Sequence, residues 1–338
     1  MAAVARWPDR VCCGLVRLPV FDAPQTYRTT ADTRSRLLGA AYRSRLPGPC
    51  AGQAREDSAV TTLIQAGELA DIVGSMPPRT GVRILDVRWK LGGPPGLPLY
   101  EAEHIPGAVY VDLDTELAGH GVPTDGRHPL PAIADLERAA RGWGLNEGDN
   151  VIVYDDLSGM SAARAWWLLR HAGVADVRVL DGGLAAWRAG GHPTESDTNR
   201  AEPGTIRLAY GALASLTADQ AQAVAQNGVL LDARAAERYR GEVEPIDPRA
   251  GHIPGAVSAP TTDNLDADGR FLSPDRLAAR FEALGVHPDA PVGVYCGSGV
   301  TAAHEALALA IAGFDPALYP GSWSAWSNDP ERPVATGA

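Results

Sequence analysis

The sequence repeats itself, and this repeat constrains the fold more than any other feature of the chain. Four pairs of segments match in the same order: RILDVRW at 83–89 with VLLDARA at 229–235, HIPGAV at 104–109 with HIPGAV at 252–257, VIVYDDLSG at 151–159 with VGVYCGSG at 292–299, and GGLAAW at 182–187 with GSWSAW at 321–326. Because both the order and the spacing persist, we interpret the chain as a duplicated domain of roughly 130–140 residues.

The repeat sets the expected domain boundaries. We expect a first domain at 58–192, a polar linker at 193–204 and a second domain at 205–338. Residues 1–57 show no sustained periodicity, so we interpret them as a flexible or disordered leader, or as a start site placed too far upstream. The arginines of this leader leave an organelle transit peptide open, although acidic residues such as Asp9 count against it.

Each half alternates strand-like and helix-like segments. RILDV and VIVYD are short apolar runs typical of strands, whereas ARAWWLLRHAG and TAAHEALALAIAG have apolar residues at helical spacing. Such alternation predicts an α/β fold in which each domain is a parallel β-sheet flanked by helices on both faces. Ligands of such sheets gather at the carboxyl ends of the strands, where Cys296 lies.

Composition and charge exclude several classes of function. A formal net charge of −11 argues against a general surface for nucleic acid or an anionic membrane. No apolar stretch approaches the roughly 18 residues of a membrane span. Four cysteines are too few and too scattered for a disulfide framework or a zinc site. A reducing, cytoplasmic setting is the default expectation.

Cys296 stands between a strand and a helix in YCGSGVTA. A cysteine attacks as its thiolate, which the N–H groups and positive end of a helix starting near Thr301 would favour. Gly297 and Gly299 would let the loop curl so that several N–H groups meet at the sulfur. A buried cysteine with a packing role is the alternative. Because the first half has Asp155 at this place, the fold does not require cysteine there, which favours chemistry in the second half.

The paired motifs carry a family resemblance over about residues 58–337. Two tandem copies with HIPGAV, a DARA…RYRG segment and YCGSGVTA resemble the tandem-domain rhodanese-like sulfurtransferases. The CGSGVT loop is similar to that of the 3-mercaptopyruvate sulfurtransferases. Thiosulfate-using rhodaneses typically have basic residues after the cysteine, where this chain has Gly297 and Ser298. The resemblance implies a non-catalytic first domain, a catalytic second domain and a site in the cleft between them.

The resemblance also implies roles for individual residues. Cys296 corresponds to the cysteine that becomes a persulfide, and Arg238, in ERYRG, to an arginine that binds the anionic donor. A guanidinium can hold a carboxylate through two parallel hydrogen bonds. Arg249, in DPRAGHIPG, is matched to a second substrate arginine, at a spacing that departs from the family pattern. We expect the loop to contact the substrate through Gly297, Gly299, Val300 and Thr301.

Ser298 is expected to assist catalysis. By resemblance it would act with a histidine and an aspartate of the first domain, for which His128, in GRHPLP, and Asp114, in VDLDTE, are the candidates. Two alternatives stay open. His128 could cap a loop beside Pro129, and Arg127 could point into the cleft as a positive charge.

The predicted function is sulfur transfer from 3-mercaptopyruvate through a Cys296 persulfide to a small thiol, a thioredoxin-like protein or cyanide, with release of pyruvate. This function implies no metal and no organic cofactor. Thiosulfate as the donor, and a non-catalytic binding module, are the alternatives. A cysteine phosphatase is disfavoured because Ala302 stands where such a loop needs arginine. We expect a monomer or a weak homodimer.

Overall fold

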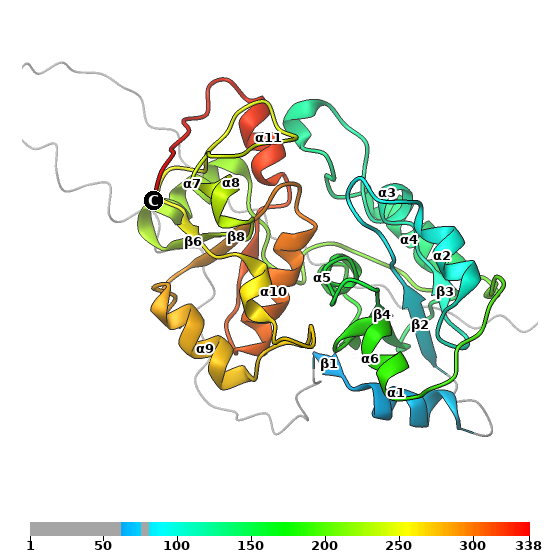
Figure 1. Cartoon of the computed structure of the whole chain (residues 1–338). Coiled ribbons are helices and arrows are strands. Elements are labelled where there is room, and N and C mark those ends of the chain that lie inside the picture. The colour runs from blue at the N-terminus through cyan, green and yellow to red at the C-terminus, as the bar shows by residue number, and fades with distance from the viewer. Residues whose placement is uncertain (1–61, 76–80) are drawn as a thin grey trace, which may run out of the picture. The chain divides into compact units, whose positions relative to one another are not determined.

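Figure 1 shows the computed structural model of the chain, which describes residues 62–75 and 81–338. The leader expected at 1–57, with Cys12, Cys13 and Cys50, lies outside the described residues. The expected domain boundaries remain predictions, and the elements below are grouped by the two halves of the repeat.

The first half alternates strands and helices as the sequence predicts. Its elements are β1 (Leu63–Ile64), α1 (Ala66–Val73), β2 (Val82–Asp86), α2 (Gly96–Ala102), β3 (Val109–Tyr110), α3 (Leu113–Glu116), the 3-10 helix η1 (Pro123–Asp125), α4 (Ile133–Gly142), β4 (Asn150–Tyr154), α5 (Ala162–His171), β5 (Val177–Leu180) and α6 (Gly183–Ala189).

The second half follows the same order. Its elements are α7 (Ala218–Asn227), β6 (Val229–Asp232), α8 (Ala236–Tyr239), β7 (Val257–Ser258), the 3-10 helix η2 (Thr261–Asn264), α9 (Pro274–Ala283), β8 (Val292–Tyr295), α10 (Thr301–Ile311), β9 (Ala317–Leu318) and α11 (Ser322–Asn328).

The two sheets share the order of four strands, and the first sheet has an additional edge strand, β1. Their strand orders are β1-β5-β4-β2-β3 and β7-β6-β8-β9, and every pairing is parallel. The register repeats as well, since Asp86 pairs with Tyr154 in the first sheet and Asp232 with Tyr295 in the second. The prediction of two parallel sheets from a duplicated sequence is confirmed.

Helices cover both faces of each sheet. One apolar cluster includes residues of α4 and α5 from the first half and of α9 and α10 from the second. Separate clusters lie on the opposite faces, beneath α1, α2 and α6 in the first half and beneath α7, α8 and α11 in the second. Helices α5 and α10 pack side by side, as Figure 1 shows, so the two halves share a continuous core.

The repeated HIPGAV segments are structural in both halves. The His104 ring stacks on Tyr100 with centroids 4.0 Å apart, and the His252 ring stacks on Tyr239 at 3.8 Å. In each pair the histidine Nδ1 also lies 2.8 Å from the tyrosine carbonyl oxygen. These histidines therefore secure the chain after α2 and α8 and are not available for the chemistry of the loop that contains Cys296.

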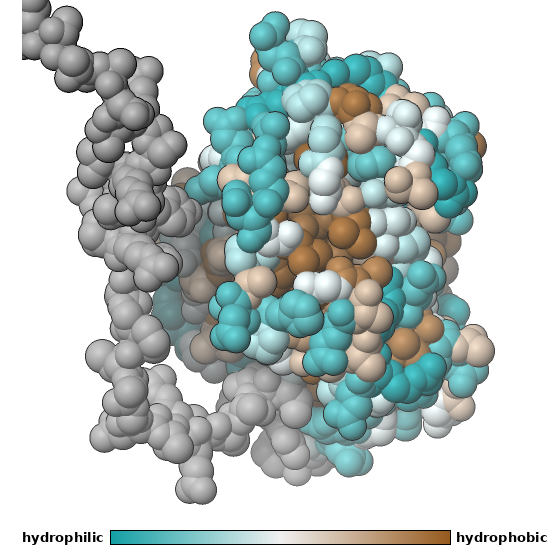
Figure 2. Space-filling model, turned by 90° about the vertical axis from the view of Figure 1, so that its left-hand side faces the viewer, coloured by the Kyte–Doolittle hydropathy of each residue, from teal (hydrophilic) through white to brown (hydrophobic). Residues whose placement is uncertain are grey.

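Figure 2 shows one face of the molecule, on which hydrophobic residues gather near the centre and hydrophilic residues surround them. Within the described ranges, no helix is both long enough and apolar enough to cross a membrane.

Candidate active site

Cys296 follows β8 directly and precedes α10, at the carboxyl edge of the second sheet. It is a free, buried cysteine whose residue is only 1% exposed. The backbone N–H of Gly299 donates to its Sγ at 3.1 Å. Gly299 has φ +81°, and a Cβ there would lie 2.5 Å from the carbonyl oxygen of Pro320. Glycine is thus required for the turn that aims this N–H at the sulfur.

Ser298, His128 and Asp114 lie together although they come from three distant segments. The Ser298 Oγ is 2.7 Å from His128 Nδ1, and His128 Nε2 is 3.4 Å from an Asp114 carboxylate oxygen. A carboxylate beside Nε2 favours the tautomer with hydrogen on that nitrogen, which leaves Nδ1 to accept from the serine hydroxyl. The arrangement can therefore pass a proton between the serine and the histidine.

His128 is held in its neutral form. Burial lowers its pKa to about 4, and the nearby Arg164 guanidinium adds to that shift, while Asp114 opposes it. The His128 ring lies perpendicular to the ring of Trp89, with centroids 5.2 Å apart. At neutral pH the imidazole can accept a proton but releases it readily.

Two arginines approach the loop at Gly297. A Cβ placed on Gly297 would lie 3.1 Å from Arg127 Nη2 and 3.4 Å from Arg238 Nη1. Asp247 accepts from Arg127 Nη1 and from Arg238 Nη2, the nitrogens that lie farther from Gly297. Glu244 also accepts from Arg238 Nη2, at 2.7 Å. The two carboxylates thus orient one nitrogen of each arginine toward the loop. These nitrogens can bind an anionic substrate beside Cys296.

Arg249 requires a correction. We expected it to bind substrate, but its guanidinium is engaged at the end of α11. It donates to four backbone carbonyls, those of Ser327, Arg332, Trp326 and Asp329. Since every nitrogen of the guanidinium already donates to a carbonyl, we assign Arg249 a structural role.

Three further loop residues, Gly297, Val300 and Thr301, were also predicted to contact the substrate. Gly297 leaves room for the two guanidinium groups. Val300 is buried at the start of α10, and Thr301 is the first residue of that helix. Contact of Val300 and Thr301 with substrate remains a prediction.

Sequence reasoning missed three contributors and treated a fourth as an alternative. Glu244 and Asp247 lie in the segment between ERYRG and the second HIPGAV, which is longer than its counterpart in the first half. That extra length was the available signal. Arg164 is a charged residue inside the apolar helix ARAWWLLRHAG, and it donates to the carbonyl of Gly299 at 3.2 Å. Arg127, considered only as an alternative, points to the loop.

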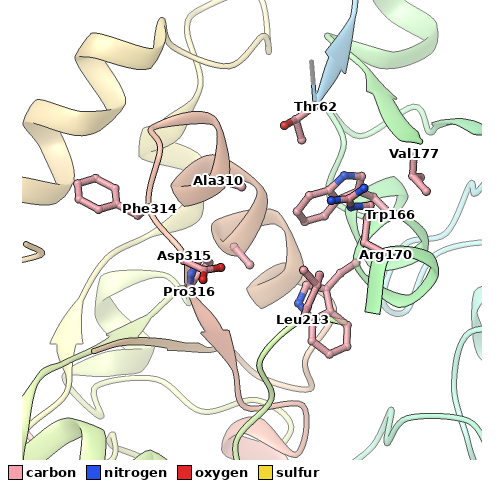
Figure 3. Close-up of a pocket in the computed structure, with 11 residues that line it drawn as sticks. Thr62, Trp166, Arg170, Val177, Leu213, Ala310, Phe314, Asp315 and Pro316 are labelled. Atoms are coloured by element: carbon pink, nitrogen blue, oxygen red, sulfur yellow. The ribbon is translucent and has the colours of Figure 1, made fainter. Parts of the chain in front are cut away.

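A groove leads to the histidine. It has a volume of about 330 Å³ and is lined by Asp114, His128, Trp89 and the chain from 90 to 97. A smaller pocket of about 180 Å³, shown in Figure 3, lies between α5 and α10, with Trp166 and Phe314 among its walls. None of the candidate residues lines this second pocket, so the groove is the better route for a substrate.

No group of three or more His, Cys, Asp or Glu side chains is placed to hold a metal ion within residues 62–75 and 81–338.

Comparison with known proteins gives consistent matches. The Rhodanese-like domain family matches residues 66–190 and 216–329. A Pseudomonas aeruginosa protein named "Probable 3-mercaptopyruvate sulfurtransferase" is 51% identical over 265 residues, covering 75% of this chain and 92% of that protein. A Mycobacterium tuberculosis protein named "Putative thiosulfate sulfurtransferase SseB" is 47% identical over 281 residues, covering 81% of this chain and 97% of that protein. The crystal structure of SseA from Escherichia coli, one of the 3-mercaptopyruvate sulfotransferases, is 34% identical with a TM-score of 0.70, covering 78% of this chain and 99% of that one.

Proposed function

The chain belongs to the tandem rhodanese-like sulfurtransferases, and we propose that its sulfur donor is 3-mercaptopyruvate. The observation that carries this choice is the contact of His128 with Ser298 in the loop of Cys296. A donor whose leaving group must gain a proton needs such a relay, whereas a donor whose leaving group departs as a stable anion does not.

Binding comes first. Arg127 and Arg238 would hold the carboxylate of the donor, because each presents a nitrogen at Gly297 while Asp247 fixes its other side. Two guanidinium groups converging on one carboxylate fix its orientation as well as its charge. The thiol of the donor would then face Cys296.

In the transfer step the Cys296 thiolate attacks the sulfur of mercaptopyruvate. A sulfur–sulfur bond forms, the carbon–sulfur bond breaks, and its electron pair remains on the organic fragment as the enolate of pyruvate. The proton of the donor thiol passes through Ser298 and His128 to the enolate carbon, which yields pyruvate and leaves a persulfide on Cys296. His128 suits this task because an imidazole with a pKa of about 4 does not retain the proton.

A sulfur acceptor completes the cycle. A thiolate attacks the outer sulfur of the persulfide, the sulfur–sulfur bond breaks, and Cys296 returns to its thiolate. We propose a small thiol or a thioredoxin-like protein as the acceptor, and the cytoplasm as the compartment, since a free catalytic thiol is maintained in reducing surroundings.

Thiosulfate is the second candidate donor, and the likeness to the Mycobacterium tuberculosis protein favours it. Its sulfonate group would bind the same two arginines, and sulfite would leave with the bonding electron pair without needing a proton. The difference between the donors is therefore the need for Ser298 and His128.

The test compares kcat/KM for the two donors with one acceptor, while pyruvate, sulfite and the mass of Cys296 are followed. We expect pyruvate release to exceed sulfite release at equal donor concentration, and Cys296 to gain the mass of one sulfur atom. Cys296→Ser is the control and should release neither product. Higher kcat/KM for thiosulfate would overturn the donor assignment, and turnover with an unmodified Cys296 would overturn the mechanism.

A further inference from the structure

Arg164 joins both halves of the molecule behind the loop of Cys296. It lies on α5 and is fully buried, with no exposed surface. Its guanidinium donates only to backbone carbonyls: Leu117 at 3.1 and 3.2 Å, His128 at 2.9 Å, Pro129 at 3.3 Å and Gly299 at 3.2 Å. One side chain thus contacts the end of α3, the segment of His128 and the loop of Cys296.

This buried cation has no carboxylate partner among the residues that the structure describes. Burial lowers its pKa to about 10, so it remains charged at neutral pH. Burying a charge without an opposite charge is costly, and carbonyl dipoles offset only part of that cost. Tyr210, which also acts on Arg164, is neutral at this pH because burial raises its own pKa to about 12. Arg164 also lowers the pKa of His128. Gly299 connects Arg164 to Cys296, because its carbonyl accepts from Arg164 while its N–H donates to the Cys296 sulfur.

We propose that Arg164 is a positioning residue that sets His128 against the Cys296 loop and supplies the fixed counter-charge of the Cys296 thiolate and persulfide. It acts through Gly299, whose carbonyl it holds and whose N–H donates to Sγ at 3.1 Å. The proposal rests on Cys296 as the sulfur carrier and not on the identity of the donor.

Other charged and titratable groups also face the loop. Arg127 and Arg238 approach it at Gly297, balanced by Asp247, and His128 reaches it through Ser298. Arg164 differs from these arginines because it is buried, bonded in both halves and unpaired with any described carboxylate. Its charge therefore acts on the sulfur whether or not a substrate is bound.

The test uses Arg164→Met and Arg164→Lys in the full chain. Alkylation of Cys296 by iodoacetamide at neutral pH needs no donor, so it reports the thiolate separately from turnover. We expect Arg164→Met to slow alkylation about tenfold, because the thiolate loses its fixed counter-charge. Arg164→Lys should alkylate at close to the wild-type rate, because it keeps the charge. Both variants should lose kcat about tenfold or more with little change in KM, since neither alters a donor-binding group.

Arg249→Met is the matched control. Its guanidinium also donates to four carbonyls, but at the end of α11. We expect this control to lose stability in urea without slowing alkylation. If folded Arg164→Met alkylates and turns over like wild type, the proposal is wrong. If Arg164→Met does not fold, Arg164→Lys decides: wild-type kcat in that variant overturns the positioning role, and alkylation about tenfold slower than wild type overturns the charge role.

Discussion

Two loops occupy the same place in the two halves and hold different groups. Each follows a central strand of its sheet, β4 or β8, and precedes the helix at the interface, α5 or α10. In the first half the Asp155 carboxylate accepts from four backbone N–H groups, those of Leu157, Gly159, Ser161 and Ala162, at 2.7 to 2.9 Å. In the second half the Cys296 sulfur accepts from the N–H of Gly299.

The first loop is an anion receptor, and we propose that its counterpart in the second half receives the persulfide in the same way. Burial raises the pKa of the Asp155 carboxyl, and the four N–H groups oppose that shift by stabilising its anion. The oxygens of aspartate lie two bonds beyond Cβ, whereas the thiol sulfur of cysteine lies one bond beyond it. A persulfide adds the second bond, so its outer sulfur corresponds in position to the aspartate oxygens. The Asp155 carboxylate occupies the first loop permanently. The corresponding group in the second loop, the outer sulfur of the persulfide, is present only during turnover.

A histidine from the opposite half faces each loop, and again the contacts differ. His128 of the first half meets the hydroxyl of Ser298 at 2.7 Å. His304 of the second half lies 3.3 Å from the backbone carbonyl of Ser158 and is fully buried. A hydroxyl can relay a proton and a carbonyl cannot, and we propose that this difference confines catalysis to the second loop.

Exchanging the two residues is the strongest test of this comparison. Cys296→Asp should lower sulfur transfer by at least about 10⁴-fold, because the nucleophile is lost. Asp155→Cys should gain no sulfur transfer, since the histidine facing that loop contacts a carbonyl. The measurement is pyruvate release with each variant, together with the mass of the substituted side chain. A persulfide that forms in the first loop of Asp155→Cys and turns over would show that the loop alone suffices.

The next effect concerns the proton relay. His128→Asn and Ser298→Ala should each lower kcat for 3-mercaptopyruvate about 10²-fold, the usual range for losing general acid–base assistance. Their kcat for thiosulfate should change by less than about threefold, because sulfite needs no proton on leaving. Arg170→Gln, on the far part of α5, is the control and should leave both donors unaffected. Equal losses for both donors would mean that the pair only shapes the loop.

The pH dependence of stability probes the two facing histidines. Burial lowers the pKa of His304 to about 4, as it does for His128. Between pH 6.5 and 4 the unfolded histidines bind protons and the folded ones do not, so their contribution to stability falls as the pH falls. Glu305, whose pKa burial raises to about 7, acts in the opposite direction. We therefore expect His304→Asn to lose less stability than wild type between pH 6.5 and 4.5, measured by urea unfolding. Parallel curves for the two proteins would contradict this.

The features of the fold and the site that could be predicted from the sequence are those that a local pattern of residues determines. Strand–helix alternation and repeated motifs predicted two parallel sheets, because each element buries residues at its own period. The motif YCGSGVTA identified the cysteine that follows β8, because the end of a strand is a local property. Ser298, His128 and Asp114 were named through the family resemblance, and the structure brings them together.

The rest of the site could not be predicted, because it depends on contacts between segments that are distant in the sequence. Arg249 matches a motif, but the segment from 242 to 251 directs its guanidinium to α11, which no local spacing reveals. Arg164 lies in an apolar helix, yet its acceptors come from residues up to 135 positions away. Arg127 reaches Gly297 only because the two halves pack together. Such partners are determined by tertiary packing, which the spacing of residues along the chain does not record.

Asp155→Asn should affect stability more than activity. An asparagine offers one oxygen and one NH2 group where the carboxylate accepts four N–H groups, so two N–H donors lose their acceptor. We expect the free energy of unfolding to fall by about 3 kcal/mol and kcat to change only a few-fold. Asp156→Asn, at the exposed neighbouring position, is the control and should stay within about 0.5 kcal/mol of wild type. Equal stability of the two variants would mean that the first loop does not need an anion.

Arg249→Met should have the smallest effect on sulfur transfer. The guanidinium of Arg249 donates to backbone carbonyls at the end of α11, whereas the arginines proposed to bind substrate, Arg127 and Arg238, lie beside Gly297. We expect KM for either donor to stay within about twofold of wild type, while loss of the buried hydrogen bonds lowers the free energy of unfolding by about 2 kcal/mol. Arg238→Met, measured alongside, should raise KM about tenfold or more, because it removes half of the anion site. If Arg249→Met raised KM as much as Arg238→Met, the structural role assigned to Arg249 would be wrong, and Arg249 would belong to the substrate site.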